Sequence, residues 1–326
     1  MQYTYEDLEI FVITRNRPEF IKRAIESVLE QTVKGCPIVV LDNSTDDKTQ
    51  QMLVQNYPNI KYIHTTQIPL ANLKMLQKIS SKTFFLLLHD DDLISNNYVS
   101  NLLSIINNND NIDFIAPSQT HFDDIKKINL KDKTTNKYIY FKNKYLFAGY
   151  CHNMFPSWSG SLTRTANFKQ IDLDENDKLY GKIGDEPLMV KSVRTGTAAI
   201  IPNPSGLYYY HHSGQDSTDD NTKITPKQFE DYLRFYKSYV QGEYVKECYA
   251  SYLLGFSRHV NHYKRFVKNT VSYDDFIKDM FLKGVIDRKI LLYSKRYYGA
   301  IYKLLTLPLK AFYGTSFNRI GNTKKI

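Results

Sequence analysis

Three adjacent aspartates, Asp90 to Asp92, follow His89 and the uncharged run FFLLL. Such a run predicts a buried strand, so the carboxylates stand where that strand leaves the core. Adjacent carboxylates repel one another, and a divalent cation such as Mn²⁺ or Mg²⁺ offsets this repulsion while it bridges a diphosphate. The alternative is an Asp-rich turn that caps the following helix.

Polar side chains also follow two earlier predicted strands, 8–14 and 37–44, and each group alone could be an ordinary turn. These residues are Thr14, Arg15, Asn16, Arg17, Asp42 and Asn43. Because ligands of parallel sheets bind at the carboxyl ends of the strands, we expect all three groups to meet in one crevice. Amides and carboxylates there can bind a base and a ribose beside a metal-held diphosphate. Neither a GxGxxG nor a GxxxxGK[ST] loop occurs in the sequence.

Strand and helix patterns alternate through the first ~120 residues, with short connections. This alternation predicts an α/β layer around a mostly parallel sheet. The predicted strands are 8–14, 37–44, 59–65, 83–92 and 111–119, and the predicted helices are 17–32, 45–57, 69–81 and 95–109, the last capped by Ser95.

The second half of the chain has weaker patterns. Alternation in KYIYFKNKYLF predicts a hairpin over 137–147, and the pattern is helical from Pro226 onward. Between them we expect a loop entering a helix (151–168), a helix ending at Gly196 (184–196) and two short strands (197–202 and 206–212).

The totals indicate a folded soluble protein with one large domain or two smaller ones, since 326 residues include 42% hydrophobic and 24% charged residues. The acidic start MQYTYEDLE does not resemble a secretory signal, and no stretch approaches the roughly 18 apolar residues of a membrane span. Cys36, Cys151 and Cys248 form no CxxC pair, which favours a reducing compartment. The sequence therefore predicts a cytoplasmic protein.

The net charge of +9 is concentrated in the tail. From Arg258 to the end, 15 Lys and Arg face 4 Asp, so the first 257 residues sum to −2. On a helix over 288–310, the basic side chains fall within an arc of roughly 120° opposite an apolar face. Such a helix can lie on an anionic membrane surface at the inner face of the cell membrane. The alternative is a helix packed on the core with a solvated basic face, and no nucleic-acid-binding motif accompanies the charge.

The segments FVITRNRPEFIKRAIESVLEQT, IVVLDNSTDD and FFLLLHDDDLI together resemble family 2 glycosyltransferases of the GT-A fold, over roughly residues 8–217. The resemblance implies an α/β fold with a mixed sheet flanked by helices. It implies a catalytic domain over 1–217, with a nucleotide-binding half (1–120) and an acceptor-binding half (121–217). A helical, basic C-terminal region would occupy 218–326.

The resemblance also assigns roles to residues at the strand ends. It implies Asp90 and Asp92 of the D-x-D motif as metal ligands, with His212 of YYYHH completing the metal site unless it is structural. The residues that it places on the nucleotide sugar are Thr14, Arg15, Asn16, Arg17, Asp42, Asn43, Asn72, Asp90 and Asp91. Asn72 has an alternative as an exposed helix residue. The sugar and acceptor would lie against Trp158, Ser159, Gly160 and Ser161, although Trp158 could equally be core.

The family's catalytic base lies in an acidic motif at the start of a helix, and GDEPLMVKSVRTG resembles that motif. The register places Asp185 on the base. The first Glu of the commoner motif is Gly184 here, which leaves Glu186 as a substitute. A carboxylate at this place could also be a simple helix cap. As a base, it would accept the proton of the attacking hydroxyl in an inverting displacement.

The predicted function is metal-assisted transfer of a sugar from a nucleotide-diphosphate donor, expected to be a UDP-sugar, to a saccharide or lipid-linked saccharide. The expected setting is synthesis of a bacterial surface polysaccharide, a capsule or an O-antigen. Two alternatives remain. A sugar-phosphate nucleotidyltransferase would be expected to carry a G-x-G-T-R loop, but TRNRP has no glycine. A polysaccharide-assembly protein that lost activity would not need the acidic motifs.

Overall fold

The computed structural model describes residues 2–66, 70–131, 133–210, 223–268, 271–288, 290–291 and 322–326. Within them, nine strands form one mixed sheet in the order β12-β8-β10-β6-β9-β4-β1-β2-β3. The strands are β1 (Leu8–Thr14), β2 (Ile38–Asp42), β3 (Lys61–His64), β4 (Phe84–His89), β6 (Ile112–Pro117), β8 (Lys137–Phe141), β9 (Ser161–Arg164), β10 (Thr197–Ile201) and β12 (Asn322–Lys325). The predicted α/β class with a mixed sheet is confirmed.

The strands that precede the polar groups are neighbours in the sheet. β4, β1, β2 and β3 run parallel, and their register pairs Thr14 with Asp42 and Ile13 with His89. Because parallel strands in this register end together, the polar residues after β1, β2 and β4 share one edge of the sheet. The three polar groups therefore meet at one edge of the sheet, as the sequence predicts.

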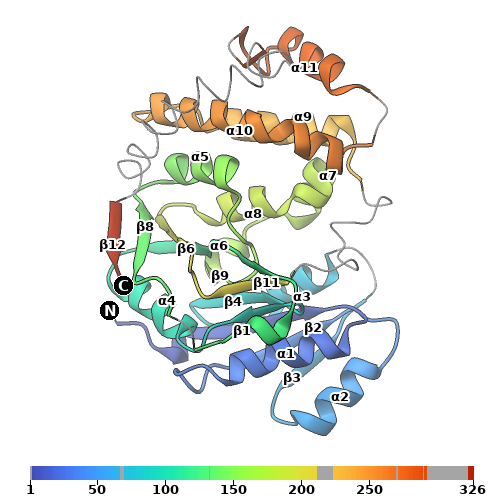
Figure 1. Ribbon diagram of the computed structural model, residues 1–326, viewed down its shortest axis with the longest axis vertical. Helices are drawn as coiled ribbons and strands as arrows, with labels where there is room; N and C mark the ends of the chain where they lie inside the picture. The colour runs from blue at the N-terminus through green and yellow to red at the C-terminus, as the bar shows by residue number, and fades with distance from the viewer. Residues whose placement is uncertain are drawn as a thin grey trace.

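Helices cover both faces of the sheet (Figure 1). Apolar side chains of α1, α2 and α4 form one core with the sheet, and those of α3, α5, α6 and α8 form another on the opposite face. The helices of these two layers, with the intervening α7, are α1 (Pro18–Leu29), α2 (Lys48–Asn56), α3 (Ala71–Ile79), α4 (Tyr98–Asn107), α5 (Lys144–Met154), α6 (Thr165–Phe168), α7 (Leu173–Tyr180) and α8 (Asp185–Ser192). Short 3-10 helices are η1 (Tyr5–Asp7), η2 (Ile125–Lys127) and η3 (Gly181–Ile183).

A smaller sheet, β5-β11-β7, lies beside the carboxyl end of β4. It consists of β5 (Asp92–Ile94), β7 (Thr120–Phe122) and β11 (Leu207–Tyr210), and its register pairs Tyr209 with Asp92. The third aspartate of the acidic run is thus held in a strand, and not in the helix cap that is the alternative for the run. The next helix, α4, begins at Tyr98 with Asn97 at its N-cap, whereas the sequence predicted a cap at Ser95.

The hairpin predicted over 137–147 is wrong. Only Lys137–Phe141 forms a strand, and α5 begins at Lys144. The side chain of Asn143 accepts hydrogen bonds from the backbone N–H groups of Tyr145 and Leu146, so it caps the helix. The helix predicted over 184–196 is real but ends at Ser192, and the predicted loop over 151–168 contains β9.

The C-terminal region packs on the second helical layer. Its helices are α9 (Pro226–Ser238), α10 (Val245–Phe266) and α11 (Tyr273–Leu282), and their buried side chains continue the core of α5 and α8 (Figure 1). The region is not helical throughout, since β12 returns to pair with β8 at the sheet edge. Most of the basic helix predicted over 288–310 lies outside the described residues. Among the described helices, none combines the length and apolar character that a bilayer crossing requires.

Candidate active site

The turn after β1 is joined directly to the acidic run after β4. The hydroxyl of Thr14 donates a 2.7 Å hydrogen bond to Asp90. Arg17, at the N-terminus of α1, lies 3.3 Å from a carboxylate oxygen of Asp90 and 3.3 Å from one of Asp91. Asp90 thus faces the protein, where a hydroxyl and a guanidinium stabilise its charge. Arg15 is exposed beside this turn.

The turn after β2 is tied to the turn after β1. Asn16 has the left-handed backbone conformation (φ 56°), which asparagine tolerates better than most residues. Its N–H donates a 2.6 Å bond to the hydroxyl of Ser44, and its side-chain oxygen accepts from Thr45. Ser44 in turn donates to the buried carboxylate of Asp42, which also accepts from Tyr62 at 3.0 Å. Asp42 is fully buried, so it shapes the turn that carries the exposed polar groups.

Asn72 connects the ends of the first three strands. Its side-chain oxygen accepts a 2.6 Å bond from Thr65 after β3, and its amide nitrogen donates to the backbone oxygen of Thr14 and to Asn43, each at 3.3 Å. Only 9% of Asn72 is exposed, so its alternative as an exposed helix residue is wrong. In this structure Asn72 links the ends of β1, β2 and β3 by hydrogen bonds.

The ligand atoms that converge at the acidic run belong to His89, Asp91 and Asp92, and all lie within 4.8 Å of one another. Asp92 is fully buried, and among the described residues neither of its carboxylate oxygens accepts a hydrogen bond of ordinary geometry. The side chain of Ser159 and the backbone of Tyr210 lie near enough to stabilise its charge in part. A buried unsatisfied carboxylate is costly, and a cation would remove that cost. Oxygen and imidazole ligands with this orphaned carboxylate therefore fit a divalent metal.

The geometry divides the predicted metal ligands. Asp92 lies in the converging group, whereas Asp90 is directed to Thr14 and Arg17 and its place is taken by Asp91 and His89. His212 lies outside the described residues. Sequence reasoning missed His89, although a histidine directly before three aspartates was a visible signal.

Burial determines the acidity of the cluster. It raises the pKa of Asp90 to about 7, and the charge of Asp91 adds to this effect while Arg17 and Thr14 oppose it. Burial, followed by repulsion from Asp91, also raises the pKa of Asp92 well above its usual range. The cluster therefore favours protons in the absence of a cation, and a cation competes with those protons.

The loop predicted to line the sugar is buried. Trp158 is 5% exposed and stacks on Phe114 with ring centroids 5.9 Å apart, so it is a core residue. Gly160 and Ser161 are also buried. Ser159 contributes to the site indirectly, since its hydroxyl oxygen accepts a 3.0 Å bond from the N–H of His89. The loop thus supports the acidic cluster through Ser159, while the ring of Trp158 packs in the core.

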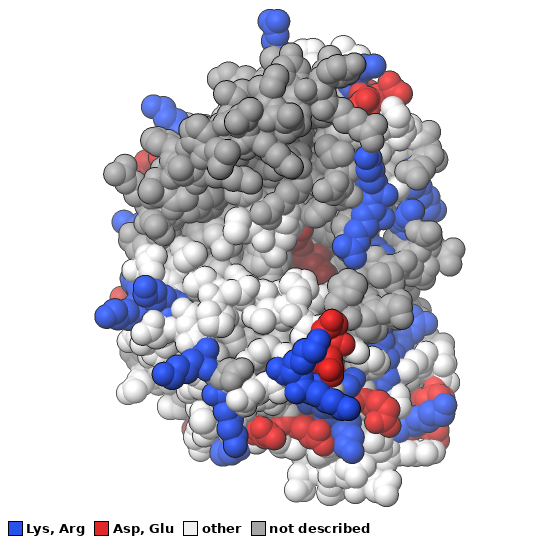
Figure 2. Space-filling view, in the orientation of Figure 1, with Lys and Arg blue, Asp and Glu red and all other residues white. Residues whose placement is uncertain are grey.

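The two carboxylates at the start of α8 face different surroundings. Asp185 keeps part of its surface open to solvent, yet desolvation by the surrounding protein raises its pKa, and the charge of His89 lowers it. Asp185 thus lies within electrostatic reach of the acidic cluster. Glu186 instead accepts hydrogen bonds from Tyr232 and Tyr236 of α9. On the molecular face in Figure 2, acidic atoms are recessed near the middle, with Lys and Arg side chains around them.

Gly184 explains the departure from the commoner acidic motif. A Cβ at this position would meet the side chain of Asn176 at 2.7 Å and the backbone oxygen of Gly181 at 2.9 Å. Asn176 also donates a 3.1 Å bond to the backbone oxygen of Gly184. No side chain fits there without displacing α7, so the first position of the motif carries none.

The comparisons with known proteins agree with this architecture. The family model for glycosyl transferase family 2 matches residues 9–172, and the chain belongs to this family. No curated protein matches the chain.

Among solved structures, the fold is similar to that of S. aureus TarS. TarS 1–349 in complex with UDP-GlcNAc is 16% identical, with a TM-score of 0.59 over 89% of this chain and 83% of that one. TarS 1–349 in complex with UDP is 14% identical, with a TM-score of 0.56 over 89% and 82%. A longer TarS structure is 14% identical in sequence and superposes with a TM-score of 0.55, and this chain spans 50% of its length.

Proposed function

We propose that the protein is an inverting glycosyltransferase that moves a sugar from a nucleotide-diphosphate donor to a hydroxyl of a saccharide or lipid-linked saccharide. The observation that carries the proposal is the exposed carboxylate of Asp185 within electrostatic reach of a converging His89–Asp91–Asp92 group. Membership of glycosyl transferase family 2 supports the reaction class. The complexes of TarS with UDP-GlcNAc and UDP support a UDP-sugar as donor.

The nucleotide would lie over the turns after β1 and β2. Arg15 and Asn16 are exposed there, Asn43 is half-buried, and Thr14 and Asp42 hold the turns from below. Arg17 already neutralises Asp90 and Asp91, so it lowers the repulsion that a diphosphate would meet at this edge. Without that guanidinium, the acidic cluster would repel the donor.

His89, Asp91 and Asp92 would hold the divalent metal, Mn²⁺ or Mg²⁺. When bound, the metal supplies positive charge that stabilises the departing nucleoside diphosphate. The unsatisfied oxygens of Asp92 are the feature of this chain that supports such a ligand.

Asp185 would act as the general base. The oxygen of the acceptor hydroxyl forms the new bond to the anomeric carbon, and Asp185 takes the hydroxyl proton. The bond from that carbon to the diphosphate oxygen breaks on the opposite side, and the nucleoside diphosphate leaves with the electron pair, so the configuration inverts. A raised pKa suits this role, because a base works best when its pKa approaches the working pH. Glu186 is held by α9 and is the weaker candidate.

The proposed setting is the cytoplasmic side of the cell membrane, where surface polysaccharides such as capsule or O-antigen are built. The excess of +11 from Arg258 onward supports attraction to anionic lipids. Residues 288–310 would provide the contact.

The experiment is a screen of nucleotide sugars for transfer and slow hydrolysis, with and without Mn²⁺, on the full chain and on Asp185→Asn. We expect one donor to be turned over, and we expect Asp185→Asn to lose at least about a hundredfold in kcat while it still binds UDP. Asp274→Asn, an exposed acid in the first turn of α11, is the matched control and should keep full activity. Full activity in Asp185→Asn would remove the base assignment. Release of pyrophosphate from a nucleoside triphosphate and a sugar phosphate would favour a nucleotidyltransferase.

A further inference from the structure

We propose that Tyr232 and Tyr236 of the C-terminal helix α9 are positioning residues that orient Asp185 by holding its neighbour Glu186. The inference rests on the proposed role of Asp185 as the base. It gives the C-terminal helices a part in the reaction that the acidic motif alone does not suggest.

The contact between α9 and the start of α8 is made by hydrogen bonds to one carboxylate oxygen. Tyr232 and Tyr236 both donate from their hydroxyl groups to Oε2 of Glu186, the second at 3.2 Å. Four residues apart on α9, the two tyrosines lie on one face of that helix. Two donors from one rigid face fix the direction of the Glu186 side chain.

Helix geometry transmits this direction to Asp185. Successive residues of an α-helix point about 100° apart, so two adjacent side chains cannot face the same partner. With Glu186 directed into α9, Asp185 must face elsewhere; it is exposed, and the charge of His89 acts on it. Rotation of the first turn that released Glu186 would also turn Asp185 away from the acidic cluster.

The first turn of α8 lacks a side-chain cap. Its N-cap residue, Gly184, has no side chain, and Pro187 has no N–H to donate. The backbone of Gly184 is held by the oxygen of Gly181, which accepts its N–H at 2.9 Å, and by the side chain of Asn176. To this backbone frame the hydrogen bonds from α9 to Glu186 add side-chain contacts that favour one orientation of the turn.

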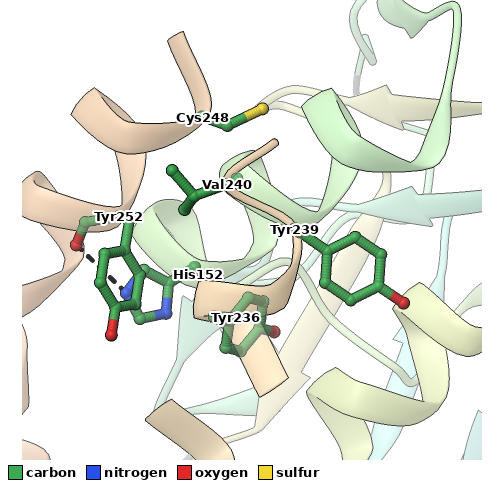
Figure 3. Close-up of a pocket in the computed structure, with 7 residues that line it drawn as sticks. His152, Tyr236, Tyr239, Val240, Cys248 and Tyr252 are labelled. Atoms are coloured by element: carbon green, nitrogen blue, oxygen red, sulfur yellow. Dashed lines mark hydrogen bonds between the residues drawn. The ribbon is translucent and has the colours of Figure 1, made fainter. Parts of the chain in front are cut away.

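The two tyrosines belong to an aromatic layer that also contains His152 and Tyr252. The ring of His152 lies 4.5 Å from that of Tyr236 and stacks on Tyr252 at 5.0 Å (Figure 3). A Cβ on Gly255 of α10 would come within 2.4 Å of the His152 ring, so this side of the layer has no spare room. Tyr236 and His152 also line a small pocket together with Val240 and Cys248 (Figure 3), so the ring contacts constrain Tyr236 on one side only. These contacts connect the position of α9 to those of α5 and α10.

The test compares steady-state kinetics of Tyr232→Phe, Tyr236→Phe and the double variant with the donor found by the screen. We expect the double variant to lose about tenfold in kcat, because small misplacements of a catalytic group cost one to two orders of magnitude, while KM for the donor changes less than twofold. Tyr252→Phe is the matched control, since its hydroxyl donates a hydrogen bond to the backbone oxygen of Leu233 in the same aromatic layer. An equal loss of kcat in this control would overturn the proposal.

Substitutions of Glu186 provide a second, independent test of the proposal. Glu186→Gln keeps an acceptor oxygen for the tyrosines and should retain most activity, whereas Glu186→Ala should resemble the double tyrosine variant. If Glu186 were the base, Gln and Ala would be equally inactive, and the positioning role would be refuted. Crystal structures of wild type and the double variant need no substrate. An unchanged direction of Asp185 there would overturn the proposal even if no sugar transfer were found.

Discussion

The hydroxyl of Thr14 at the end of β1 donates a 2.7 Å hydrogen bond to Asp90, the first residue after β4. Asp90 also lies 3.3 Å from Arg17 of α1 and is only 4% exposed. The first aspartate of the acidic run is therefore part of the scaffold that joins two strand ends, and the remaining aspartates face the site with His89.

This arrangement predicts which residues bind the metal. We expect His89→Ala, Asp91→Asn and Asp92→Asn to weaken Mn²⁺ binding in the presence of UDP by at least about tenfold each, since each would lose a direct ligand. Asp90→Asn should weaken it less, because its carboxylate is directed to Thr14 and Arg17. Calorimetric titration of Mn²⁺ measures both effects. Normal binding by Asp91→Asn with the largest loss in Asp90→Asn would restore Asp90 as the ligand.

Local patterns were sufficient to predict the half of the fold that carries the turns after β1, β2 and β4. β1, β2 and β4 are buried apolar runs, and α1 (Pro18–Leu29) lies within the predicted helix 17–32. The meeting of the polar groups followed from the order of the strands alone, because parallel strands end at one edge. Asp185 could be predicted only from the family motif, since a carboxylate at a helix start is common.

The remaining features depend on contacts between distant segments. Trp158 belongs to the core because Phe114 of β6 lies against it, and no local pattern reveals that partner. β12 has only four residues, NTKK, and becomes a strand because β8 offers a free edge. The bonds from Tyr232 and Tyr236 to Glu186 span 46 and 50 residues, so sequence spacing could not predict them.

Because the buried carboxylate of Asp92 has no hydrogen-bond partner among the described residues, we expect it to lower stability without metal and to raise stability when metal is bound. In EDTA, Asp92→Asn should be more stable than wild type by about 1 kcal/mol, because a neutral amide costs less to bury than an unpaired charge. With Mn²⁺ and UDP the order should reverse, since only wild type gains binding energy in the folded state. Thermal unfolding under both conditions measures this reversal.

Asp113 is the matched control for that experiment. Its buried carboxylate accepts bonds from the N–H groups of Arg194 and Gly196 at 2.9 and 2.8 Å and lies 3.3 Å from Arg164. Asp113→Asn should therefore destabilise the protein both with and without metal. A loss of stability in metal-free Asp92→Asn as large as that in Asp113→Asn would mean that Asp92 is satisfied in the folded protein.

Glu230 predicts a pH-dependent link between α9 and the end of α11. Burial alone would raise its pKa, but hydrogen bonds from Lys283 (3.0 Å) and Arg234 (2.8 Å) outweigh burial and lower it. A lowered pKa in the folded state means that this stabilisation is complete above the unfolded pKa of about 4.5 and is lost as the pH falls through the folded pKa. Glu230→Gln should cost about 1 kcal/mol at pH 7 and progressively less as the pH falls below about 4.5. Urea unfolding at pH 7 and over a series of lower pH values checks this, and a cost that does not change with pH would assign the effect to packing.

The C-terminal strand β12 predicts a role for the last residues in protecting the sheet edge. Thr323 and Lys324 pair with β8, the ammonium of Lys324 lies 4.2 Å from the ring centre of Tyr140, and the N–H of Ile326 donates to Asn136. Deletion of 322–326 would expose the hydrogen-bonding edge of β8, and exposed edges favour pairing between chains. We expect the deleted protein to unfold at a lower temperature and to self-associate in light scattering. Lys324→Met should keep the association state of the wild type, because it keeps the backbone pairing and removes only the ammonium with its contacts to Asn109 and Tyr140. A monomeric deletion variant with an unchanged unfolding temperature would show that β12 does not hold this edge in solution.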